Sequence, residues 1–188
     1  MRKIFKIILA IFAVLIIGVL LFAGIIFLDL AASFATGSET LTASGSVMGK
    51  ALVVYDPGLS GAAKDVANKV SLSLQENGYT VTFAGIKSSS ANSPLGYNII
   101  VAGGPIYAGT PTSSVKDFLI SLDSIQGVAL GVFGSGSGPQ EQIDITQIEN
   151  FIAGLPNSNS LSDAIVVKIG SGEDINARSA DFVSQLIP

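Results

Sequence analysis

Five short apolar runs alternate with helical patterns from Lys50 to the end of the chain. Each run is five or six residues of mainly apolar side chains bounded by glycine, proline or polar residues, which is typical of buried strands. The five runs are Ala51–Tyr55, Tyr79–Ala84, Asn98–Ala102, Val128–Phe133 and Ala164–Ile169. The alternation predicts a parallel sheet with helices on both faces, within one α/β domain of ordinary size.

The third run predicts the central strand of this sheet. Residues 99–102 are apolar without interruption, which favours a strand covered on both faces. We expect Gly103, Gly104 and Pro105 to end this strand, and a helix to begin behind Thr110 as its N-cap. A loop in this place lies at the carboxyl end of its strand, where open α/β sheets bind ligands.

The predicted helices follow three of the other strands. The helix after the first strand has an apolar face of Ala63, Val66, Ala67, Val70 and Leu74 and ends at Gly78. The helix after the fourth strand begins behind Pro139 and has Ile145, Ile148 and Ile152 on its apolar face. The last helix begins behind Asp174 and has Ala180, Val183 and Leu186 on its apolar face. The segment 85–96 is rich in serine and too short for a crossover helix, so we expect a loop.

The amino terminus has a different composition from the rest. No charged residue occurs from Ile7 to Leu28, and at about 1.5 Å per residue this run crosses a hydrocarbon core of about 30 Å. We therefore expect residues 4–28 to contact the lipid bilayer as one transmembrane helix of a single-pass cell-membrane protein. Because Arg2, Lys3 and Lys6 precede the run, the soluble domain is predicted to be extracytoplasmic.

A cleaved signal peptide is the alternative, since small residues follow the apolar run. The length of the run exceeds an ordinary signal-peptide core and favours a retained anchor. The predicted organisation is an anchor over residues 1–30, a flexible linker rich in Ser, Thr, Gly and Ala over 31–49, and the α/β domain over 50–188.

The residue content excludes several kinds of chemistry. The chain has no cysteine and no histidine, which excludes disulfides, thiol nucleophiles, histidine bases, cysteine-ligated clusters and ordinary zinc sites, so no metal site is expected. The net charge is −4, and the domain is more acidic than the whole chain because the amino terminus is basic. This acidity argues against a nucleic-acid ligand and favours a basic protein partner.

The motif GGPIYAGTPTSSVKDFL, together with the strand layout, resembles the flavodoxin-like family. In that family a loop of the form G-S/G-P-x-Y-x-G follows the third strand. The resemblance extends from about Lys50 to the carboxyl terminus. It implies a doubly wound, five-stranded parallel sheet of order 2-1-3-4-5 that binds flavin mononucleotide (FMN) where the strand order reverses.

The resemblance also implies a phosphate-binding loop after the first strand of the domain. The residues that correspond to the family pattern S/T-x-T-G-x-T are Gly58, Ser60, Gly61, Ala62 and Ala63. Gly58 and Ala63 replace hydroxyl residues, and each lost hydrogen bond to a charged acceptor is worth about 1.5 to 3 kcal/mol. The backbone amides from Ser60 to Lys64 remain to hold an anion, with the Lys64 side chain as a countercharge.

Two further loops are implied for the flavin ring. The residues are Pro105, Ile106, Tyr107, Ala108 and Gly109 in the first loop, and Ser135 and Gly136 in the glycine-rich segment 134–138. Tyr107 would stack on the ring, and the alternative is a tyrosine that covers the core. None of these residues is a conventional catalytic acid or base.

Three functions remain open from the sequence. The first is a membrane-tethered FMN-binding electron carrier that docks a redox protein. The second is an FMN-dependent NAD(P)H reductase of quinones or other acceptors. The third is a degenerate flavodoxin-like module that has lost the flavin and serves as a binding or structural domain.

Overall fold

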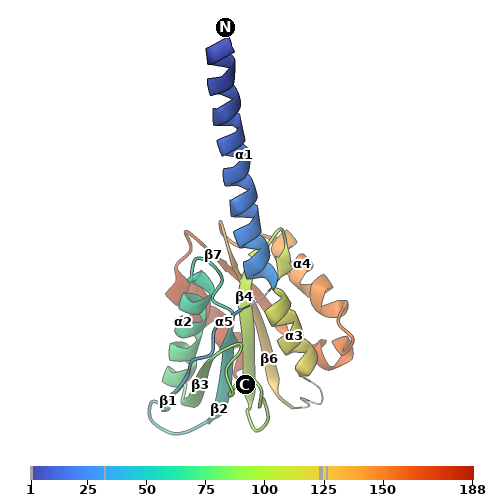
Figure 1. The fold of residues 1–188 in the computed structure, drawn as a ribbon. Helices are drawn as coiled ribbons and strands as arrows, with labels where there is room; N and C mark the ends of the chain where they lie inside the picture. The colour runs from blue at the N-terminus through green and yellow to red at the C-terminus, as the bar shows by residue number, and fades with distance from the viewer. Residues whose placement is uncertain (1, 32, 123–124, 126) are drawn as a thin grey trace.

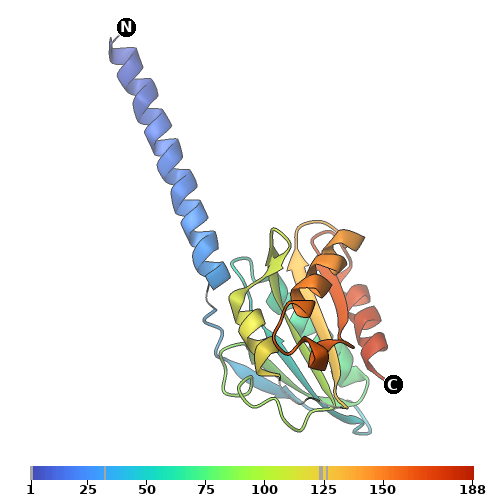
Figure 2. The ribbon, with the colours of Figure 1, turned by 90° about the vertical axis from the view of Figure 1, so that its right-hand side faces the viewer.

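The computed structural model describes residues 2–31, 33–122, 125 and 127–188. The domain is a twisted sheet with helices packed on both faces, and one long helix projects from it (Figure 1 and Figure 2). The sheet order is β1-β3-β2-β4-β6-β7, and β5 pairs with β4 outside this path.

Five of the strands are parallel and correspond to the five predicted runs. They are β2 (Gly49–Tyr55), β3 (Tyr79–Gly85), β4 (Ile99–Tyr107), β6 (Ala129–Gly136) and β7 (Ile165–Gly170). Numbered among themselves along the chain, they follow the order 2-1-3-4-5. The predicted α/β, flavodoxin-like arrangement is therefore confirmed.

The helices cover the two faces of the sheet in pairs. On one face lie α2 (Ala62–Glu76) and α5 (Ile175–Leu186), and on the other lie α3 (Ser113–Ser121), α4 (Gln142–Ala153) and the short 3-10 helix η1 (Ser158–Leu161). Successive residues of the central strands enter opposite cores, as Ile100 and Val101 do. This confirms that the third apolar run is buried on both sides.

Strand β1 (Ser38–Leu41) lies in the segment predicted to be a flexible linker. It pairs antiparallel with β3, and the chain before it is also attached, because the amide of Gly85 donates to the Gly37 carbonyl at 2.8 Å and that of Lys87 to the Ala35 carbonyl at 2.8 Å. The prediction was wrong for these residues. Three of its four side chains are exposed and it is held mainly by main-chain hydrogen bonds, so the sequence has no hydrophobic pattern that would predict it.

Strand β4 does not end at Gly103 as predicted, but continues to Tyr107. A Cβ at Gly103 would collide with the carbonyl oxygen of Phe133, and one at Gly104 would lie 2.9 Å from Val115 Cγ2. These glycines therefore make room for neighbouring elements rather than form a turn.

The turn comes later in the chain, at Ala108 and Gly109, which have φ values of 49° and 80°. It joins β4 to β5 (Thr110–Pro111) in a tight hairpin. Thr110 therefore belongs to a strand, and the N-cap position of α3 falls on Thr112 instead.

The long helix α1 (Arg2–Ala31) contains the apolar run of the amino terminus. Residues Ile4–Leu28 form a helix long and apolar enough to cross a bilayer, and none of its described side chains is buried by the domain. Its carboxyl end lies beside α3 (Figure 1).

Candidate functional site

The candidate site lies at the carboxyl edge of the sheet, defined here as the end where the five parallel strands finish and α2, α3, α4 and α5 begin. β2, β4 and β6 are direct neighbours in the sheet. The three segments that sequence predicted for a ligand follow or end these strands. The fold therefore places all three on one side of the molecule, at the point where the strand order reverses.

The loop between β2 and α2 packs on the end of β4. Gly58 has φ 61°, and a Cβ there would lie 2.7 Å from Pro105 Cγ. A side chain at Gly58 would separate the loop from the strand. Two of the predicted segments are thus in direct contact.

Asp56 is the most buried charged side chain at this edge, with 1% exposure. Its Oδ2 accepts a hydrogen bond from the Thr112 hydroxyl at 2.8 Å, and its Oδ1 accepts from the Gly58 amide at 3.3 Å. The carboxylate therefore links the β2–α2 loop to the start of α3. Sequence reasoning missed the contact of Asp56 with Thr112, which lies 56 positions away along the chain.

The amino terminus of α2 is open. Its N-cap residue is Gly61, which has no side chain to cap the helix. The Ser60 hydroxyl accepts from the Ala62 amide at 3.3 Å, whereas the amides of Ala63 and Lys64 have no partner in the described part of the chain. Free amides and the helix dipole favour an anion at this point.

This loop fits the phosphate of FMN only in part. The Ala63 and Lys64 amides and the Ser60 hydroxyl are suitable donors, and the Lys64 side chain is exposed beside them. Against this, the Gly58 amide is already bonded within the loop, and the Asp56 carboxylate places a negative charge next to the anion. The donors that remain are mainly backbone groups.

The β4–β5 hairpin has the residues predicted for the flavin ring. Tyr107 is half-buried and Ala108 is exposed at the turn, so both are accessible from this edge. Ile106 differs, because its Cδ1 occupies the space where a Cβ of Gly134 would be, and its side chain packs on the α3 and α4 side of the core. The structure places Ile106 in the packing under the hairpin.

Gly134, Ser135 and Gly136 were predicted to be loop residues, but they are the end of β6. Ser135 is buried between Pro105 and Ile169 in the sheet, and Gly136 pairs with Gly170. The missing side chain of Gly134 accommodates Ile106. The loop beside the site therefore begins only at Ser137.

Two cavities adjoin the open end of α2. One of about 430 Å³ lies between the last turns of α1 and the β2–α2 loop, with Asp56 in its wall. The other, of about 270 Å³, is lined by Tyr55, Phe83, Glu39 and Lys64.

Sequence reasoning missed Tyr55, which stacks on Phe83 with ring centroids 4.6 Å apart. Burial, and then the charge of Glu39, raise the pKa of the Tyr55 phenol, which therefore stays neutral.

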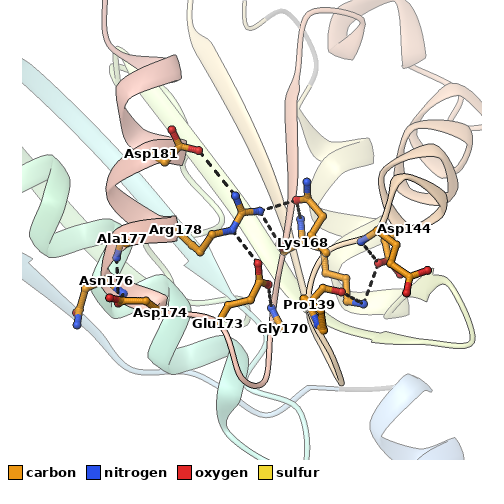
Figure 3. A network of polar contacts seen from close by, with 12 residues as sticks. Pro139, Asp144, Lys168, Gly170, Glu173, Asp174, Asn176, Ala177, Arg178 and Asp181 are labelled. Carbon is orange, nitrogen blue, oxygen red and sulfur yellow. Dashed lines mark hydrogen bonds and ion pairs between the residues drawn. The ribbon is translucent and has the colours of Figure 1, made fainter.

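The other end of the carboxyl edge is filled by a polar network (Figure 3). Lys168 Nζ lies 2.9 Å from Asp144 Oδ2 and donates to the Pro139 carbonyl at 3.4 Å. Arg178 pairs with Glu173 at 3.0 Å. Burial alone would raise the pKa of Asp144, but hydrogen bonds from Lys168 and the Glu141 amide, together with the Lys168 charge, lower it below the usual value.

No protein-family model and no curated protein sequence matches the chain. Solved structures do. A short-chain flavodoxin associated with a bacterial microcompartment is 23% identical, with a TM-score of 0.56 over 74% of this chain and 97% of that one.

Two other structures are similar over nearly the same region. Oxidised flavodoxin 2 from Bacillus cereus is 20% identical, with a TM-score of 0.53 over 73% of this chain and 97% of that one. An NADH:FMN oxidoreductase in its apo form is 11% identical, with a TM-score of 0.53 over 74% and 88%. At these identities the likeness establishes a flavodoxin-like fold.

Proposed function

We propose that the chain is a membrane-tethered flavodoxin-like protein that binds FMN at the carboxyl edge of its sheet and transfers electrons. The observation that supports this most directly is the arrangement of the open α2 amino terminus and the Tyr107 hairpin on neighbouring strands. The solved structures with this fold include two flavodoxins. α1 serves as the tether, because it is long and apolar enough to cross a bilayer.

In this proposal each part of the site has a separate task. The Ala63 and Lys64 amides and the Ser60 hydroxyl bind the phosphate, and the hairpin with Tyr107 positions the ring. A bound flavin supplies the redox chemistry, and the chain holds and orients it. The acidic domain surface favours a basic redox protein as the partner.

A specific observation favours a second candidate, a module that has lost the flavin. Asp56 places a buried carboxylate beside the phosphate position, and the loop's own oxygens occupy the Gly58 and Ala62 amides. Because these amides already have hydrogen-bond acceptors within the loop, the folded loop is stable without a bound anion.

FMN titration of the full-length protein in detergent separates the two candidates. If the chain is an electron carrier, the purified protein is yellow and quenches flavin fluorescence in a saturable way. If it has lost the flavin, the protein is colourless and does not bind added FMN. NADH oxidation by the loaded protein with a quinone acceptor would further distinguish a reductase from a carrier.

Asp56→Asn sharpens this experiment. The change removes the charge but keeps an oxygen that can accept from Gly58 and an amide group that can bond Thr112. We expect FMN binding to strengthen by on the order of 1 kcal/mol, or about fivefold in Kd, because repulsion of the phosphate is relieved. Asp163→Asn removes an exposed carboxylate and serves as the control. If neither wild type nor Asp56→Asn binds FMN, the flavin proposal is wrong.

A further inference from the structure

The connection between α1 and the domain is too short to let the domain leave the membrane surface. The apolar run ends at Leu28, and α1 continues as a helix to Ala31. Ser33 is already buried, and the Ala35 carbonyl accepts from Lys87 at the end of β3. Ala35 follows Leu28 by seven positions, which even a fully extended chain would span in about 25 Å.

The carboxyl edge is the part of the domain nearest to α1. The cavity of about 430 Å³ is lined by Ile25 and Leu28 from α1 and by Pro57, Gly58 and Leu59 from the β2–α2 loop. Ile25 and Leu28 belong to the apolar run that is long enough to cross a bilayer and that the proposed function makes the tether. Leu59 therefore lies level with the end of that run, and both views show α1 leaving from this edge (Figure 1 and Figure 2).

Exposed apolar side chains occur both at the carboxyl edge and at the opposite edge, where the parallel strands begin. Leu59 is 53% exposed and Phe34 86% exposed near α1, while Val47 is 68% exposed just before β2, at the opposite edge. Exposure alone does not distinguish these edges. Of these two edges, only the carboxyl edge lies beside α1, the proposed membrane tether, so only there can lipid cover the apolar groups.

We propose that the carboxyl edge of the sheet docks on the bilayer surface, with Leu59 and Phe34 in the layer between headgroups and acyl chains. The exposed Lys87, whose amide bonds Ala35, lies where a lysine contacts lipid phosphates. This inference rests on the membrane tether of the proposed function but not on flavin binding. The cavity beside Asp56 then opens toward lipid, and molecules dissolved in the bilayer reach it without crossing bulk water.

The absence of tryptophan from the chain allows a direct test. Full-length L59W, F34W and V47W proteins, placed in phosphatidylcholine and phosphatidylglycerol vesicles, each contain a single tryptophan that can be excited selectively over the four tyrosines. Insertion into the interfacial layer, which indoles prefer, should shift L59W and F34W emission to the blue. Lipids brominated near the headgroup should in addition quench this emission about twofold. V47W emission should remain that of exposed tryptophan.

Equal and weak quenching of all three variants would overturn the proposal. F34W replaces one exposed aromatic residue with another and keeps the test valid if L59W folds poorly. Flotation of the same vesicles checks the tether separately: protein that does not float refutes both the tether and the docking. FMN titration in detergent reports on the flavin site whatever the vesicles show.

Discussion

Two loop–helix junctions at the same edge of the sheet differ in how their backbone groups are satisfied. At the β7–α5 junction, Asp174 Oδ1 accepts from the amides of Asn176 and Ala177 at 2.9 and 3.2 Å, and Glu173 accepts from the Gly170 amide at 2.8 Å. At the β2–α2 junction, Gly61 offers no cap, and the amides of Ala63 and Lys64 have no partner in the described part of the chain.

The difference shows where an anion can bind. Both helices direct their first-turn amides and a positive dipole end toward the carboxyl edge, but in α5 the helix's own carboxylate already accepts from two of these amides. Glu173 and Asp174 would also repel a second negative group. We call these the closed junction (β7–α5, with its Lys168 and Asp144 contacts) and the open junction (β2–α2). Of the two, only the open junction has first-turn amides that are still available to an anion.

The largest expected effect is loss of stability at the closed junction. Lys168→Met keeps the bulk of a side chain that is nearly buried but leaves the Asp144 carboxylate without its cation. We expect a loss of about 2 to 4 kcal/mol in the free energy of unfolding, since breaking a mostly buried pair leaves an uncompensated charge. Urea denaturation of the full chain in detergent, followed by circular dichroism, measures it.

Lys64→Met is the matched control at the open junction. Lys64 is exposed, and no described residue lies within salt-bridge distance of it. Its replacement should change stability by less than about 0.5 kcal/mol. Equal losses in the two variants would remove the distinction between the junctions.

The sequence was sufficient to predict the five parallel strands and their order because buried strands require unbroken apolar runs. Val53 and Val101, for example, are fully buried, as the unbroken apolar runs around them predict. Strand β1 could not be predicted in this way, since three of its four side chains are exposed and it is held mainly by pairing with β3. The prediction of a flexible linker over 31–49 was therefore wrong for residues 38–41.

The candidate site was predictable in place but not in detail. Gly103 and Gly134 were interpreted as loop residues, although they provide space for Phe133 and Ile106 within the sheet. The contact between Asp56 and Thr112 depends on two segments that only the fold brings together. A local sequence pattern predicts neither the packing beside these glycines nor the Asp56–Thr112 contact, because each depends on residues that are distant in the sequence and adjacent only in the fold.

The next effect concerns ligand affinity at the open junction. Ser60→Ala removes the one side-chain hydroxyl that matches the phosphate pattern. We expect FMN affinity to fall by about 1.5 kcal/mol, or roughly tenfold in Kd, with little change in stability. Ser171→Ala is the control, because its hydroxyl accepts from the Gly138 amide beside the closed junction. Isothermal titration calorimetry measures the FMN Kd of both variants. Equal values would argue against phosphate binding at Ser60.

The smallest effect is the pH dependence of the closed junction. The folded-state pKa of Asp144 lies below its unfolded value of about 3.9, so the carboxylate stabilises the folded protein above that pH. This contribution is lost as the pH falls from the unfolded pKa through the lower, folded one. Asp144→Asn should therefore show a flatter decline in denaturation midpoint below about pH 4, whereas Ser171→Ala, which removes no charge, keeps the wild-type slope. An unchanged slope in Asp144→Asn would mean that the closed junction is held by its neutral hydrogen bonds and packing, and that its contrast with the open junction does not depend on the ion pair.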